Sequence, residues 1–92
     1  MLKEIIEEHC FVEQLDELQK KYSRVYDAKD SMSWVLARSP KHGEPLDGFS
    51  DHMVAKTRMV GGTPSFRFLY KFDYENDHVH MIAIAAVEDG ED

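Results

Sequence analysis

The amino-acid sequence predicts an α+β fold in which two antiparallel helices pack on one face of an antiparallel sheet of three or four strands. Apolar residues recur at helical spacing between Phe11 and Leu36, and the spacing changes to strict alternation from Met53 onward. The 92 residues are 42% hydrophobic and 11% aromatic, which suffices for one modest core. We therefore expect a single domain over residues 1–87 and a short acidic tail over residues 88–92.

The first part of the chain is predicted to contain the helices. Leu2, Ile5 and Ile6 favour a short opening strand, and a first helical turn is the alternative. Two amphipathic helices should follow, with Ser23 as the N-cap of the second and the Ser-Pro pair at 39–40 as its end. Their apolar stripes are Phe11, Leu15, Leu18 and Tyr22 in the first helix, and Val25, Ala28, Met32, Val35 and Leu36 in the second.

The second part of the chain is predicted to form the sheet. Residues 41–50 are rich in Gly, Pro, Asp and Ser, so we expect a loop there before the strands begin. Turns are expected at residues 61–64 and, as a two-residue loop, at Glu75 and Asn76. The resulting register pairs Phe72 with Val79, Lys71 with His80, Tyr70 with Met81, Leu69 with Ile82, Phe68 with Ala83 and Arg67 with Ile84.

Alternation along the strands gives the two faces of the sheet different chemistry. Phe66, Phe68, Tyr70 and Phe72 form the most apolar row, so we expect this row to pack on the helices. A platform for single-stranded nucleic acid is the alternative for these rings. The opposite face then has no helix to cover it, and it is either a solvated surface or a partner-binding surface. Its expected members are Lys56, Arg58, Arg67, Lys71, Leu69, Ile82 and Ile84.

Charge and composition exclude several classes of function. A formal charge of −7 argues against a general nucleic-acid binder, because such proteins are usually basic. Residues 53–72 are the exception, with four basic residues and no acidic one. No apolar run is long enough for a membrane span, and the opening residues do not form a signal peptide. With Cys10 as the lone cysteine, we expect a cytoplasmic protein without disulfides or membrane partners.

Other residues have both a structural and a functional interpretation. His78 and His80 share one strand face and could bind a metal, but the spacing supplies no third ligand. We therefore expect no metal and no cofactor. Trp34 is expected in the core or against the sheet, with a protein interface as the alternative. Cys10 is expected to be inert, because no neighbouring residue in the sequence indicates an activating base.

Several segments together resemble the RelE/ParE superfamily of toxins from bacterial type II toxin-antitoxin modules. They are two helices, Leu-Asp-Gly at residues 46–48, Lys-x-Arg at 56–58, FRFLYKFD at 66–73 and HMIAIA at 80–85. The resemblance covers essentially the whole chain. It implies a sheet with helices on one face, a shallow concave site on the other, and an antitoxin that wraps the toxin.

The superfamily contains two activities, and the resemblance implies different residues for each. The ribosome-dependent branch cuts mRNA without a metal, and Lys56, Arg58 and Arg67 resemble its basic strand residues. There, Lys56 or His80 would be the base for the RNA 2′-hydroxyl, and the arginines would stabilise the charge on phosphorus. The gyrase-targeting branch poisons a topoisomerase and needs no nuclease chemistry.

The segment after the last strand departs from the nuclease branch. Residues 87–92 read VEDGED, where nuclease members carry basic or aromatic residues. Carboxylates there would repel a phosphodiester. We therefore expect a toxin-like component that inhibits growth by protein binding, with a cognate antitoxin and DNA gyrase as partners. An mRNA endonuclease acting on the ribosome and a diverged, non-toxic interaction module are the alternatives, and a homo-oligomer stays open.

Overall fold

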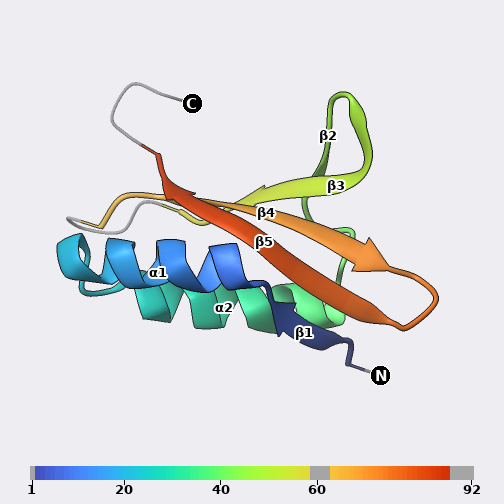
Figure 1. Ribbon diagram of the computed structural model, residues 1–92, viewed down its shortest axis with the longest axis horizontal. Helices are drawn as coiled ribbons and strands as arrows, with labels where there is room; N and C mark the ends of the chain where they lie inside the picture. Colours follow the sequence, from blue (N-terminus) through green and yellow to red (C-terminus); the bar gives the residue numbers. More distant parts are fainter. Residues whose placement is uncertain (1, 59–62, 88–92) are drawn as a thin grey trace.

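The computed structural model describes residues 2–58 and 63–87, which form two helices and one five-stranded sheet (Figure 1). The helices run antiparallel beneath one face of the sheet, and no described element covers the central strands on the other face. In spatial order the strands are β1-β5-β4-β3-β2. The elements are β1 (Glu4–Glu7), α1 (His9–Lys21), α2 (Val25–Arg38), β2 (Glu44–Leu46), β3 (Phe49–Lys56), β4 (Phe66–Asp73) and β5 (His78–Ala86).

The apolar stripes expected from the sequence face the core, except for Val35, which is partly buried and lies outside the core cluster. The expectation that Ser23 is the N-cap of α2 is wrong. Arg24 is the N-cap residue and makes no side-chain cap, while Ser23 lies inside a turn in which the N–H of Val25 donates to the carbonyl of Tyr22. Helix α2 ends as expected, where Ser39 N–H donates to the carbonyl of Val35. The stripe residues in the core or packed against it are Phe11, Leu15, Leu18, Tyr22, Val25, Ala28, Met32 and Leu36.

The fold class is confirmed, and the sheet contains more strands than expected. The opening strand exists as β1, but it pairs parallel to β5, so the sheet is mixed rather than wholly antiparallel. The expected loop at residues 41–50 instead contains β2 and the start of β3, joined by a turn in which Gly48 has φ 83°. Strand β2 has only three residues, including Pro45 at the sheet edge, so it carries almost no strand signal.

A bulge changes the register of the β4–β5 hairpin. The pairing follows the expected register from Asp73 to Tyr70 and then shifts by one residue, with Ile82 as the extra residue of β5. Beyond the bulge, Phe68 pairs with Ile84, whose side chain turns into the core with 4% of its surface exposed. The expectation that Ile84 lies on the uncovered face is therefore wrong. Because residues 82 to 86 are all apolar, alternation gives no sign of the bulge.

The aromatic row of β4 faces the helices, as expected. Phe66, Phe68 and Tyr70 are fully buried, and Phe11 from α1 packs against Phe68 with ring centroids 6.2 Å apart. Burying side chains of this size stabilises the fold by about 1.5–3 kcal/mol each. The row is therefore core, and its rings are not available as a stacking platform.

Trp34 does not lie in the core. It is 60% exposed on α2, and the guanidinium of Arg38 stacks on its ring at 3.7 Å from the centroid. The expectation of a structural contact is wrong, because position 34 lies outside the arc of α2 that faces the sheet.

Two expectations concern residues outside the described ranges: the turn at 61–64 in part, and the acidic tail at 88–92 entirely. Within the described ranges, neither helix has the length and apolar character that crossing a membrane requires.

Candidate functional site

The candidate site is the uncovered face of the sheet. Residues paired directly across an antiparallel ladder point to the same face, so strand register assigns this surface. Three rungs of side chains cross β3, β4 and β5, and the middle one is aliphatic and partly buried. We name them the Arg67 rung (Lys56, Arg67, Ala85), the Leu69 rung (Val54, Leu69, Ala83) and the Lys71 rung (His52, Lys71, His80).

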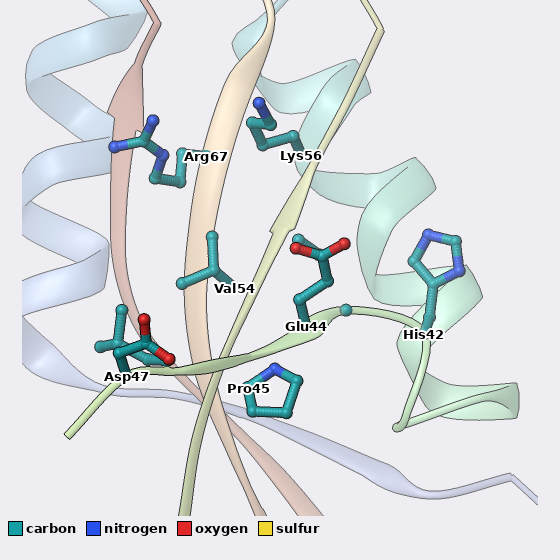
Figure 2. A pocket seen from close by; sticks show the side chains of 10 residues that line it. His42, Glu44, Pro45, Asp47, Val54, Lys56 and Arg67 are labelled. Carbon is teal, nitrogen blue, oxygen red and sulfur yellow. The ribbon is translucent and has the colours of Figure 1, made fainter. Parts of the chain in front are cut away.

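A hollow of about 590 Å³ lies beside the Arg67 rung (Figure 2). Lys56 and Arg67 sit directly opposite each other on β3 and β4, and both are exposed. Glu44 on β2 and Asp47 in the following turn bring two carboxylates into the same hollow. The hollow is therefore a mixed-charge site rather than a cationic one. Its lining residues are His42, Gly43, Glu44, Pro45, Leu46, Asp47, Val54, Ala55, Lys56 and Arg67.

A buried tyrosine holds the wall of this hollow in place. Tyr70 donates its hydroxyl hydrogen to the carbonyl of Pro40 at 2.7 Å and accepts the N–H of Gly43 at 2.9 Å. Burial raises the pKa of Tyr70, and the hydrogen bond from Gly43 partly opposes that rise. Gly43 is required there because a Cβ would lie 2.5 Å from the carbonyl oxygen of Val54. The core thus fixes the loop that precedes β2.

A second hollow, of about 890 Å³, lies at the Lys71 rung between the start of α1 and the β4–β5 turn. Here Glu8 orients His80, with 2.8 Å between Glu8 Oε2 and His80 Nδ1. Glu4 lies 3.7 Å from His78, its partner in the β1–β5 ladder. Each histidine therefore has its own carboxylate. Across residues 2–58 and 63–87, no three metal-ligating side chains converge on one point.

Solved structures of RelE proteins share this architecture. A chain of the toxin-antitoxin complex RelBE2 from Mycobacterium tuberculosis matches with a TM-score of 0.74 and 21% identity, over 94% of this chain and 99% of that one. The E. coli toxin RelE, solved free with two arginines replaced by alanine, matches at 0.69 and 22%, over 99% and 90%. The chain has the RelE fold. The archaeal RelE–RelB complex from Pyrococcus horikoshii is more distant, at 0.52 and 16%, over 94% of this chain and 96% of that one.

The resemblance to the RelE/ParE superfamily is thus confirmed for the fold. No family model matches the sequence, and no curated protein matches it. At identities of 22% or less, the similarity lies in the arrangement of elements, and the side chains of the uncovered face must be judged from this chain's own geometry.

The RelE fold brings some of the expected site residues together. Lys56 and Arg67 form one rung, while Leu69 and Lys71 follow Arg67 on the same face of β4. Ile82 is the bulge residue beside them and is partly buried. These placements agree with the surface expected from the sequence.

Two other expected site residues lie apart from the Arg67 rung. Arg58 lines a separate hollow of about 250 Å³ with Arg24 and Asp27, next to the start of α2. His80 belongs to the Lys71 rung, which lies about 13 Å farther along the sheet than the Arg67 rung. The structure therefore does not assemble His80 and Arg58 with Arg67.

Sequence reasoning missed the residues that complete the two hollows. Glu44, Asp47 and His42 come from the segment expected to be a plain loop. Glu8 reaches His80 only through the parallel pairing of β1 with β5, which joins segments 72 residues apart. Local sequence patterns carry no signal for either arrangement.

Proposed function

We propose that this chain is the toxin-type component of a type II toxin-antitoxin module, and that its uncovered sheet face binds the antitoxin. The RelE fold supports the first part, since the similar structures are a toxin and toxin-antitoxin complexes. The observation that carries the second part is the Leu69 rung. Aliphatic side chains in the centre of an uncovered sheet face are typical of a protein-binding surface with a polar rim.

The charges around the Arg67 rung favour a protein partner over RNA. Glu44 and Asp47 share the hollow with Lys56 and Arg67, so the described side chains carry no net positive charge there. A phosphodiester needs a surplus of positive charge to bind and to be stabilised as it is cleaved. A protein segment can instead place groups of either sign against this mixed surface.

The test is expression of the chain alone and together with the product of an adjacent short reading frame. The chain alone should arrest bacterial growth, and co-expression should restore growth and yield a co-purifying complex. Leu69→Glu should abolish that complex, because it buries a charge in the centre of the surface. Val12→Glu, on the exposed side of α1, is the matched control. A complex that tolerates Leu69→Glu and is lost with Val12→Glu would contradict the proposed surface.

A second candidate function is a metal-independent mRNA endonuclease acting on the ribosome. The observation in its favour is the direct pairing of Lys56 with Arg67 across β3 and β4, which places two cations at one hollow. Arrest by cleavage should produce truncated mRNA on translating ribosomes, and this cleavage should be lost in Lys56→Ala/Arg67→Ala. Arrest through DNA gyrase should instead induce the SOS response and leave mRNA intact.

A further inference from the structure

We infer that the uncovered face binds a protein segment carrying two acidic side chains about 13 Å apart with an apolar side chain midway between them. This inference rests on the proposed function, since it specifies the partner of the same face. Strand β4 presents the complementary pattern at every second residue: Arg67, Leu69 and Lys71.

The two cations of this pattern have no partner among the described residues. The side chains of Arg67 and Lys71 make no hydrogen bond, ion pair or ring contact with any residue of the ranges 2–58 and 63–87. Most other cations of these ranges do have a partner within the chain. The pairs are Lys3 with Asp77, Lys20 with Glu17, Arg24 with Asp27, Lys29 with Glu7 and Asp30, Arg38 with Trp34, and Lys41 with Tyr74.

No described acidic group beside the Lys71 rung forms an ion pair with Lys71. Glu8 is engaged by His80, and Asp73 accepts hydrogen bonds from the backbone N–H groups of Glu75 and Asn76 and from the Asn76 side chain. Glu8 and Asp73 are therefore committed to partners within the chain. Asp51 and Glu75 also line this hollow, but neither forms an ion pair with Lys71. A carboxylate from another molecule can therefore pair with Lys71 without displacing an existing ion pair.

The two cations are separated by an aliphatic surface of defined length. Arg67 and Lys71 are four residues apart on one strand, which gives about 13 Å between them. The Leu69 rung fills the interval with three aliphatic side chains. An extended segment lying along β4 would match this surface with an acidic residue, an apolar residue and an acidic residue at alternate positions.

The aliphatic centre also distinguishes a polypeptide from RNA. Proteins that bind single-stranded RNA place aromatic rings or planar groups under the bases. The Leu69 rung at the centre of the surface contains no aromatic or planar side chain. The planar groups of this face are the Arg67 guanidinium and the His52 and His80 rings of the flanking rungs, and the aromatic row of β4 lies on the buried face. A leucine or valine side chain fits the Leu69 rung, whereas a base finds no stacking partner there.

The test is an amide NMR titration of the whole chain with a synthetic peptide. Its core reads Glu-Ser-Leu-Ser-Glu between Gly-Ser flanks, and comparison peptides carry Gln for both Glu, or Ser for Leu. We expect shifts along β3–β5 and a loss of about two- to fivefold in affinity for each acidic charge removed. Arg67→Gln and Lys71→Gln should weaken binding equally. Lys20→Gln, a lysine of α1, is the matched control and should not change it.

Glu44→Gln provides an independent check. Removing a carboxylate from the hollow at the Arg67 rung should strengthen binding of the acidic peptide by a similar factor. Equal binding of the three peptides, or shifts confined to the helices, would overturn the inference. An RNA oligomer of equal charge that binds the same face more tightly than the peptide would also overturn it. Co-purification of an antitoxin alongside either result would leave the proposed toxin role standing and would remove only the assignment of the binding surface.

Discussion

Replacing Tyr70 with phenylalanine tests whether the core holds the wall of the Arg67 hollow. The ring is fully buried and would keep its packing, while the hydroxyl that joins Pro40 and Gly43 would be lost. The Pro40 carbonyl and the Gly43 N–H would then lack their partner. A buried polar group without a partner costs about 1–3 kcal/mol, and partial access of water to this loop favours the lower half. We expect the free energy of unfolding to fall by about 2–4 kcal/mol for the two groups together.

Urea unfolding measures this loss of stability. The same loss should lower the thermal midpoint by about 4–8 °C per kcal/mol in a domain of this size. Hydrogen exchange at the Gly43 amide should also become faster than the global opening rate, since the loop loses its tether to the sheet. Tyr74→Phe is the matched control, because Tyr74 is 68% exposed. A Tyr70→Phe variant as stable as this control, with unchanged protection at Gly43, would refute the reasoning.

Three other substitutions test the wall, the bulge and the hairpin turn. Gly43→Ala should destabilise the fold in urea titrations, because its Cβ would meet the carbonyl oxygen of Val54 at 2.5 Å; unchanged stability would contradict the close approach. Ile84→Ala should cost about 2–5 kcal/mol and Ile82→Ala clearly less, whereas the reverse order would place the bulge elsewhere. Hydrogen bonds from Asn76 hold the pKa of Asp73 in the folded protein below its usual 3.8. The ionised Asp73 carboxylate therefore stabilises the fold above pH 3.8, and this contribution is lost as the pH falls through the lowered pKa of the folded state. The gap in thermal midpoint between Asp73→Ala and the parent should therefore narrow below about pH 3.8, and a constant gap would exclude this linkage.

The parts of the fold that the sequence predicted are those in which burial repeats with the period of the element. The stripe on α1 and the aromatic row of β4 both face a single core, so their spacing carries the information. The opening strand was also predicted, but its parallel partner was not, because pairing between Ile5 and Val79 depends on the path of the whole chain. Residue spacing within β1 is the same whichever partner it has.

The sequence predicted only those residues of the candidate site whose direction follows from the alternation of side chains along a strand. Arg67, Leu69 and Lys71 follow from the inward aromatic row, since every second residue of β4 must face the other way. Ile84 was misplaced by the bulge, and Arg58 lies past the end of β3, where alternation no longer fixes its direction. The carboxylates of the Arg67 hollow come from a three-residue strand that is too short to show any period.

The parallel pairing of β1 with β5 has a consequence for synthesis. Residues 4–7 leave the ribosome early and must wait for residues 78–81 before their backbone groups find a ladder. Until β5 is synthesised, β1 has no strand to pair with and β4 lacks one of its two neighbours in the sheet. We therefore expect the surface to be complete only after β5 has been synthesised, in one late step, so that a partner already present in the cell could bind it as soon as it forms.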